Sequence, residues 1–171
     1  RSVSGPEYVA ALLDHGNIEL RNQEAVMEPS GEAPLVWCTG SAAKKALDWR
    51  GLHQIRGQLE VLKPIPGLNH AICFGHYLLP GDDCAVLGAS YDHDDHDPEV
   101  REDTAEASLA IAQVAFPGLS MHRTGGRTSF RLSSRDRLPL VGPDPEGRHW
   151  FSLAHGSRGA STGPFLGAFL A

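Results

Sequence analysis

Polar and apolar residues alternate along several segments of the chain, and this alternation predicts strands. Residues 55–62 alternate as a half-buried strand does. Residues 71–79 and 85–91 predict two further strands, joined as a hairpin through a turn at residues 80–83. Shorter apolar runs predict strands at residues 35–38, 128–132 and 150–154, and an extended segment at residues 138–143.

Apolar residues at helical spacing lie between these strands. A short helix is predicted between Ser4 and Gly16, both of which suit helix ends. Asp97, as an N-cap directly before Pro98, predicts the start of a longer helix. Two more helices are predicted at residues 42–49 and 164–171. The mixture predicts an α+β fold with a central antiparallel sheet.

The composition is that of a soluble globular protein, with 41% apolar and 21% charged residues among 171. That length allows one ordinary domain or two small lobes. No run of about 18 apolar residues is present, so we expect no membrane contact. The three cysteines form no C-x-x-C pair. This favours a reducing, cytoplasmic location over a disulfide framework or a cysteine zinc site.

The net charge of −6 hides an uneven distribution of charged residues. Residues 82–106 carry ten acids and one base, whereas residues 121–137 carry five arginines and one acid. The overall charge gives no support to nucleic-acid binding, but a local arginine patch can meet phosphate. Arginines on a solvated strand and loop are the alternative interpretation.

A run of aspartate and histidine at residues 91–97 has the ligand types of a divalent metal site. The run lies between a predicted strand and a predicted helix, where these residue types commonly serve turns and N-caps. We therefore predict a solvated turn and no metal. The chain also lacks the G-x-S-x-G turn of serine hydrolases around Ser157.

The last predicted strand leads into a glycine-rich turn that opens a helix, with the sequence G-S-R-G at residues 156–159. Such a helix start presents unpaired N–H groups and a positive dipole end to an anion or an electron-rich carbonyl. Earlier in the chain stands D-R-L-P-L-V-G, which ends at Gly142. Together the two motifs resemble the C-terminal signature of the D-amino-acid-oxidase-like flavoenzymes.

Within this superfamily the motifs are most similar to those of the oxidase half of the MnmC family, which modifies the wobble uridine of tRNA. Residues 56–58, 77–80 and 88–92 also resemble the substrate-domain strands of that family. The resemblance implies an FAD cofactor lying between two parts of the fold. Residues 1–48 and 130–171 would be segments of an incomplete, Rossmann-like FAD-binding domain, and residues 49–129 an antiparallel substrate domain.

The resemblance also implies roles for individual residues. Arg131 matches a position that often holds a substrate carboxylate, for which a planar guanidinium is well suited. Tyr77 would line the substrate pocket. The residues expected to contact FAD are Val26, Gly40, Gly142, Gly156, Ser157, Arg158 and Gly159.

The implied reaction acts on 5-carboxymethylaminomethyl-(2-thio)uridine in tRNA. Oxidation of its C–N bond with hydride transfer to FAD, followed by hydrolysis of the imine, would leave the 5-aminomethyl base. The implied partners are tRNA and FAD, with a fused methyltransferase domain that this chain lacks. Two alternatives stay open, namely a small-molecule amine oxidase similar to glycine or sarcosine oxidase, and a non-catalytic module that binds RNA or protein through residues 123–137.

The sequence departs from the family in two respects. The G-x-G-x-x-G fingerprint that opens a dinucleotide-binding domain is absent. Residues 24–34 are also shorter than the hairpin that such proteins place there. We therefore expect a fragment, and we expect it to bind FAD poorly by itself.

Overall fold

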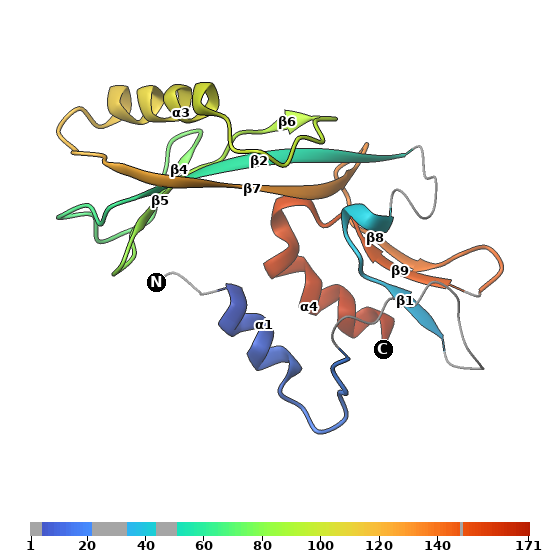
Figure 1. Cartoon of the computed structure of the whole chain (residues 1–171). Helices are drawn as coiled ribbons and strands as arrows, with labels where there is room; N and C mark the ends of the chain where they lie inside the picture. The colour runs from blue at the N-terminus through green and yellow to red at the C-terminus, as the bar shows by residue number, and fades with distance from the viewer. Residues whose placement is uncertain (1–4, 22–33, 44–50, 148) are drawn as a thin grey trace.

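The computed structural model describes residues 5–21, 34–43, 51–147 and 149–171, which form two sheets and several helices (Figure 1). The larger sheet has the strand order β3-β4-β5-β2-β6, with β7 paired to β2. The smaller sheet has the order β1-β9-β8. Helix α3 covers one side of the larger sheet, and α1 and α4 lie toward the other side (Figure 1).

A long antiparallel ribbon forms the centre of the larger sheet. Strand β2 (Leu52–Leu62) pairs with β7 (Arg123–Ser134) along its whole length, with one irregularity at Val61/Leu62. The other edge of β2 pairs with β5 and β6. The remaining strands of this sheet are β3 (Ile72–Cys73), β4 (Tyr77–Leu79), β5 (Ala85–Gly88) and β6 (Asp92–His93).

The hairpin predicted around residues 80–83 is present, because β4 pairs antiparallel with β5. Two boundaries were predicted wrongly. The single strand expected at residues 71–79 is divided into β3 and β4, with Gly75 at φ 93 between them. The strand expected at residues 128–132 is much longer, since Gly125 and Gly126 belong to β7 and pair with β2.

The smaller sheet joins three short strands: β1 (Leu35–Trp37), β8 (Leu140–Pro143) and β9 (His149–Leu153). Strands β1 and β9 are parallel, and Trp37 lies opposite Phe151. Both side chains belong to a buried cluster that also contains Leu52 and Leu132 of the long ribbon. This shared core attaches the smaller sheet to one end of the larger sheet.

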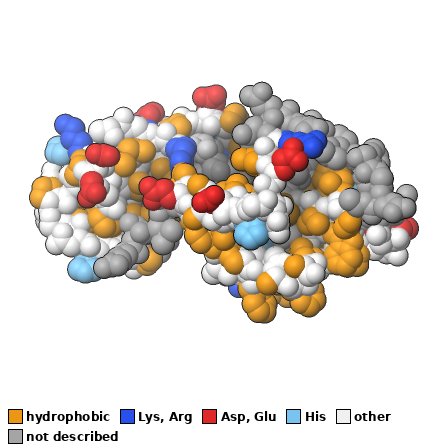
Figure 2. All heavy atoms as spheres, turned by 90° about the horizontal axis from the view of Figure 1, so that it is seen from below, with side chains coloured by type: hydrophobic (Ala, Val, Ile, Leu, Met, Phe, Trp, Pro, Cys, Tyr) orange, Lys and Arg blue, Asp and Glu red, His pale blue; other side chains and the backbone are white. Residues whose placement is uncertain are grey.

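The helices differ in how much they bury. Helix α3 (Glu102–Ala115) buries Ala105, Ser108 and Ala112, and Ala112 packs with Leu78 and Leu87 of the sheet. Helices α1 (Gly5–Leu13) and α4 (Gly159–Leu170), with the 3-10 turn η1 (Gly156–Arg158) before α4, contain no fully buried residue. Apolar side chains accordingly gather on the face seen in Figure 2.

Helix α3 starts later than the predicted start at Asp97 and Pro98. The carbonyls of Asp97, Glu99 and Arg101 accept hydrogen bonds from buried side chains of β2. Those carbonyls therefore point toward the sheet, which favours an extended segment, and the helix begins only at Glu102. The side chain of Asp97 instead accepts a hydrogen bond from the Glu99 amide, as in a turn.

The predicted α+β class with an antiparallel sheet is confirmed. The division into an FAD-binding part and a substrate part stays a prediction. No helix in the described ranges is long and apolar enough to cross a bilayer.

Candidate functional site

A hollow of about 220 Å³ lies where the parallel strands β1 and β9 end. Cys38 and Gly40 follow β1, and Ala154, His155 and Gly156 follow β9; all five line the hollow. Because β1 and β9 are parallel neighbours, their carboxyl ends meet at one edge of the sheet. Open sheets with parallel strands bind ligands in the crevice at this edge.

Three of the residues that line this hollow have left-handed backbone. Gly40 has φ 57, Ala154 has φ 58 and Gly156 has φ 58. At Ala154 this conformation costs about 1–3 kcal/mol, and such strain is concentrated at ligand sites. A Cβ atom built at Gly40 or Gly156 would meet nothing within 4 Å, so both glycines border open space. The backbone at these positions is therefore accessible to a bound molecule.

The turn after β9 is held by His155. The Nε2 atom of this ring is 3.1 Å from the Ser152 hydroxyl, and Nδ1 is 2.9 Å from the Thr162 hydroxyl. Burial lowers the pKa of His155, so the neutral ring is favoured. Neither η1 nor α4 has a side-chain cap at its start. The first N–H groups and the positive end of the helix dipole can therefore stabilise negative charge near the turn.

A second contact fixes this turn to the loop between β7 and β8. Arg158 donates a hydrogen bond to the carbonyl of Arg137. Within the loop, the Asp136 carboxylate accepts hydrogen bonds from the Leu138 amide and the Ser134 hydroxyl, which lower the pKa of Asp136. The two sequence motifs that carried the resemblance are thus adjacent in space.

Arg131 joins the hollow to the larger sheet. It lines the hollow from β7, and its guanidinium lies against Gly57 of β2: a Cβ atom at Gly57 would be 2.7 Å from Arg131 Nη2. The guanidinium carbon is 5.9 Å from the centre of the Tyr91 ring. Among the described residues, Arg131 forms no ion pair with a carboxylate. Its charge is therefore available to an anionic group of a ligand.

Tyr77 lies on the same face of the sheet as Arg131. A Cβ atom built at Gly88 would be 3.0 Å from the Tyr77 hydroxyl. Gly88 lies opposite Leu59, two residues from Gly57. Gly57 and Gly88 are thus diagonal neighbours about 7–8 Å apart, with Arg131 over one and Tyr77 over the other. We call this side of the sheet the site face and the opposite side, beneath α3, the α3 face.

The structure brings some of the predicted cofactor residues together. Gly40 and Gly156 line the hollow with Arg131, and Ser157 and Arg158 line a neighbouring hollow of about 570 Å³ that also includes Gly156. Gly159 is the first residue of α4, directly after η1.

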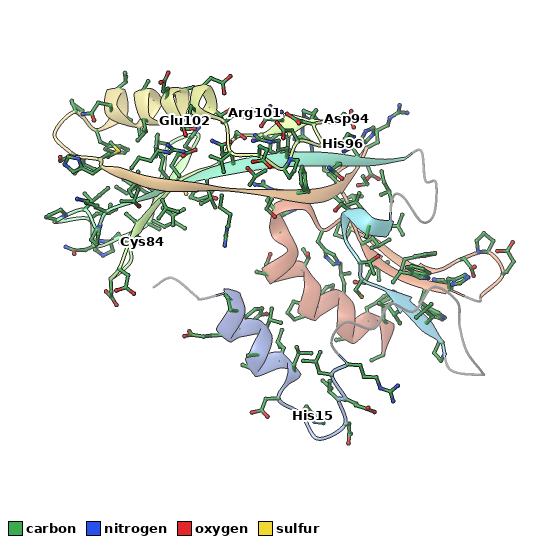
Figure 3. The ribbon with its side chains drawn as sticks, in the orientation of Figure 1. His15, Cys84, Asp94, His96, Arg101 and Glu102 are labelled. Atoms are coloured by element: carbon green, nitrogen blue, oxygen red, sulfur yellow. The ribbon has the colours of Figure 1, made fainter. Side chains whose placement is uncertain are left out.

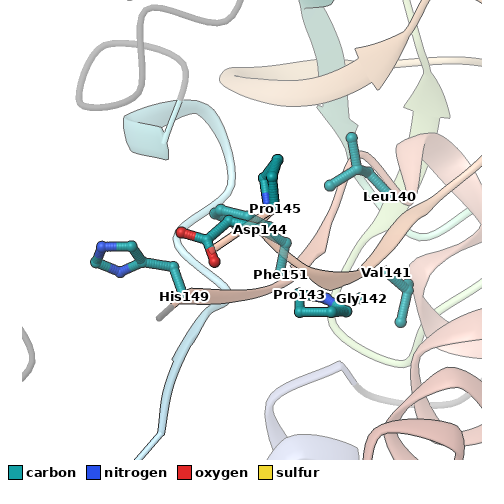
Figure 4. Close-up of a pocket in the computed structure, with 8 residues that line it drawn as sticks. All are labelled: Leu140, Val141, Gly142, Pro143, Asp144, Pro145, His149 and Phe151. Carbon is teal, nitrogen blue, oxygen red and sulfur yellow. The ribbon is translucent and has the colours of Figure 1, made fainter. Parts of the chain in front are cut away.

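The other two predicted cofactor residues lie elsewhere. Gly142, with φ 139, lines a separate pocket of about 550 Å³ between β8 and β9 (Figure 4). Val26 lies outside the described residues.

Sequence reasoning missed three residues of this region. Ala154 carries no local signal for left-handed backbone. His155 stands directly before the recognised glycine motif, and that adjacency was the available signal. Tyr91 was counted with the aspartates and histidines of residues 91–97, although an exposed aromatic residue beside them was itself a signal.

The metal alternative for residues 91–97 receives no geometric support. Asp92 pairs with Arg56, whereas Asp95 and Asp97 pair with Arg101 at the start of α3. Arg101 lies above the sheet, on the α3 side, in Figure 3. Within the described part of the chain, no group of three possible ligands is assembled.

The fold places this hollow at the carboxyl ends of parallel strands, where open sheets bind ligands. The family model for FAD-dependent oxidoreductases, DAO, matches residues 9–171, and the chain belongs to this family. The predicted superfamily and the predicted FAD cofactor are thereby confirmed.

Curated relatives carry the name tRNA 5-methylaminomethyl-2-thiouridine biosynthesis bifunctional protein MnmC. The relative from Thiobacillus denitrificans is 32% identical over 133 residues, which cover 70% of this chain and 22% of the relative. The relative from Burkholderia vietnamiensis is 38% identical over 124 residues, covering 66% and 19%. The chain thus spans about a fifth of the length of these two relatives.

Solved structures show the same fold. Glycine oxidase from Geobacillus kaustophilus has a TM-score of 0.67 at 18% identity, covering 80% of this chain and 40% of that one. Iminodiacetate oxidase from Chelativorans sp. BNC1 has a TM-score of 0.66 at 22% identity, covering 84% and 42%.

The residues present fit part of an FAD molecule. The open backbone at Gly40 and Gly156 permits close approach of a planar ring, and the uncapped start of η1 and α4 suits the negative charge of a reduced flavin. The hollow of about 220 Å³ is smaller than the roughly 300–1,000 Å³ of typical small-molecule sites. It therefore suits one portion of the cofactor.

Proposed function

We propose that this chain forms the substrate-binding and flavin-facing part of an enzyme that oxidises 5-carboxymethylaminomethyl-(2-thio)uridine in tRNA. The observation that carries the proposal is the position of Arg131. It is a guanidinium without a carboxylate partner among the described residues, placed between the hollow of Gly40 and Gly156 and the site face. The names of the MnmC relatives support tRNA as the substrate.

FAD, when bound, supplies the acceptor for the hydride that leaves the carbon beside the substrate amine. Arg131 would bind the carboxylate of the substrate through two parallel hydrogen bonds and so fix its secondary amine. Tyr77 would donate a hydrogen bond from the neighbouring position over Gly88. The C–N bond becomes an imine, and water hydrolyses it to the 5-aminomethyl base and an aldehyde.

The amide groups of η1 and the start of α4 would stabilise the negative charge that accumulates on the cofactor side. His155, neutral and bonded to Ser152 and Thr162, holds this turn in place rather than exchanging a proton. The domain division, the fused methyltransferase and the cytoplasmic location remain part of the proposal.

Arg131→Gln tests the proposal, with Arg127→Gln as a matched control on the same strand and face. In the full-length, FAD-loaded protein that carries this chain, Arg131→Gln should raise KM for the modified RNA about 10- to 100-fold, because a charged hydrogen-bond pair is lost. Arg127→Gln should leave KM within about twofold. Both constants come from steady-state turnover, with product measured by mass spectrometry.

An unchanged KM for Arg131→Gln would remove Arg131 from the substrate site. Turnover of glycine or sarcosine with no turnover of modified RNA would replace the tRNA substrate by a free amino acid. That second outcome is part of the test, because Arg131 and Tyr77 can hold any amine that carries a carboxylate.

A further inference from the structure

Two hollows beside the candidate site share the side chain of Tyr91. One, of about 570 Å³, is also lined by Arg137 and Arg158. The other, of about 340 Å³, is also lined by Arg135 and Arg137. Tyr91 is 48% exposed, so its ring stands between the two hollows and remains accessible from solvent.

The charge of this region is predominantly positive. Arg135 and Arg137 are exposed, and neither forms an ion pair with a described residue. Two acids share the region. Asp136 is occupied by hydrogen bonds within its own loop, and Asp94 lies 3.9 Å from His53.

The loop that carries the two arginines is rigidly built. Ser134 donates to the carbonyl of Leu138 as well as to Asp136, and Arg158 donates to the carbonyl of Arg137. These contacts hold the backbone of Arg135 and Arg137 beside the two hollows, so little backbone entropy is lost when a ligand binds.

The Tyr91 ring is supported in the same way. It packs edge-to-face on His93, with 5.1 Å between ring centres, and it faces the Arg131 guanidinium at 5.9 Å. Tyr91 therefore connects the arginine that we place at the substrate carboxylate with the arginines of the loop. An exposed, supported aromatic ring with guanidinium groups on both sides has the composition of a single-stranded RNA site.

We propose that Tyr91, Arg135 and Arg137 form a subsite for a nucleotide that flanks the modified uridine. Tyr91 stacks on the base of that nucleotide, and Arg135 and Arg137 contact the adjoining phosphates. This inference rests on the proposed tRNA substrate and names the residues that distinguish RNA from a free amino acid. A free amino acid bound by Arg131 and Tyr77 carries no base to stack on Tyr91 and no phosphate to reach Arg135 and Arg137.

The test measures binding of a fluorescently labelled RNA stem-loop to the full chain by anisotropy, near physiological salt. Tyr91→Ala should weaken binding about 5- to 100-fold, because one base loses its stacking partner. Tyr91→Phe keeps the ring and should bind within about twofold of the unaltered protein.

The arginines are tested by the salt dependence of the same binding. Arg135→Ala and Arg137→Ala should each reduce the slope of log K against log salt by about 0.7, the value for one phosphate of a single strand. Arg127→Ala is the control. Arg127 is also exposed and forms no ion pair with a described residue, but it lies within β7, eight residues before Arg135. It should leave the slope unchanged, because charges more than about 8–10 Å apart are screened at this salt.

Equal RNA affinity for Tyr91→Ala and the unaltered protein would overturn the subsite, and so would an unchanged slope for both loop variants. A melting curve shows whether each variant is folded. The slope of log K against log salt counts phosphate contacts, so it does not depend on the absolute affinity of any one variant. Failure of the proposed function has a different signature, namely no oxidation of modified RNA by the FAD-loaded protein although the three residues still determine RNA binding.

Discussion

The two faces of the β2–β7 ribbon use arginine for different purposes. On the α3 face, Arg56 is completely buried, together with Gln58 and Glu60. On the site face, Arg131 has no carboxylate partner among the described residues. The same residue type thus stabilises the fold on one side and leaves its charge available for a ligand on the other.

The α3 face is a fully paired polar network. Arg56 donates to the Asp92 carboxylate at 3.1 Å, to Gln58 Oε1 at 2.9 Å and to two backbone carbonyls. Glu60 accepts from Gln58 at 2.9 Å and from Arg123 at 2.6 Å, and the hydrogen bond that Arg123 donates to Glu60 raises the pKa of Arg123. In the described residues no buried side-chain polar atom lacks a partner. Such a network is costly to disturb.

On the site face, two positions of the sheet carry no side chain of their own, namely Gly57 and Gly88. The side chains of Arg131 and Tyr77 lie directly over these two positions. The comparison teaches that an arginine indicates function when it is partly buried and has no carboxylate partner, and indicates structure when each of its guanidinium nitrogens has an acceptor.

The largest effect on stability is expected for Arg56→Ala. This change leaves the Asp97 carbonyl without its donor. It also removes one of the donors to Asp92, Gln58 Oε1 and the Glu99 carbonyl, which keep Ser90, the Arg101 amide and Thr128. Asp92 is 36% exposed and stays hydrated, so the cost comes from the buried acceptors and the vacated space, about 2–5 kcal/mol together. Urea denaturation gives the free energy of unfolding.

The matched control is Arg127→Ala on the site face, which should change the free energy of unfolding by less than about 0.5 kcal/mol. Similar losses for the two variants would contradict the division between the faces.

A pair of glycine variants separates activity from stability. In Gly57→Ala the new Cβ atom would be 2.7 Å from Arg131 Nη2, so the flexible guanidinium must move. Catalysis should fall about 10- to 100-fold, because a displacement of about 1 Å has that effect on a positioned group. Stability should change little. Turnover and melting temperature are measured on the same preparation.

Gly126→Ala places the extra methyl group on the α3 face. There it would be 2.8 Å from Val100 Cγ1 and 3.1 Å from Glu60 Oε2, which are held in place. Overpacking should cost about 1–3 kcal/mol of stability and leave turnover unchanged. A loss of turnover in Gly126→Ala equal to that in Gly57→Ala would show that the faces are not independent.

The sequence predicted the strands of this ribbon better than it predicted which of their side chains are buried. Alternation at residues 55–62 correctly predicted a strand, and the half-buried interpretation would place its polar side chains in solvent. Instead Arg56, Gln58 and Glu60 are completely buried, while Leu59 and Val61 are only partly buried. The partners that satisfy these groups come from distant residues, so no local pattern could show the reversal.

The candidate site was predicted in part, and for a different reason. The resemblance of the motifs, not periodicity, predicted FAD contacts for Gly40 and Gly156 and a substrate contact for Arg131. It did not predict that these three residues line one hollow. The left-handed backbone at Ala154 depends on how β9 meets the hollow. The contact of Tyr91 with Arg131 depends on the pairing of β6 and β7 with β2. Neither could be read from neighbouring residues.

The smallest expected effect is a difference in acid sensitivity between the two faces. Burial lowers the pKa of His155 below its ordinary value of 6.5. Between the lowered pKa and 6.5, the unfolded chain therefore binds more protons than the folded chain at this residue. Stability rises with pH in that interval, so the turn that His155 holds should weaken as the pH falls below 6.5.

The acids of the α3 face respond only in stronger acid. Hydrogen bonds from Arg101 and the Asp97 amide lower the pKa of Asp95, and those from the Glu99 amide and Arg101 lower that of Asp97, in both cases below 3.8. Their contribution is complete above 3.8 and is lost as the pH falls through the lowered values. Amide hydrogen exchange at pH 5 should therefore show reduced protection of the amides in η1 and at the start of α4, while the amides of β2 remain protected. His155→Gln should remove this difference between pH 5 and pH 7, because glutamine does not titrate. Equal protection of η1 at the two pH values in the unaltered protein would exclude His155 as the acid-sensitive support of the turn.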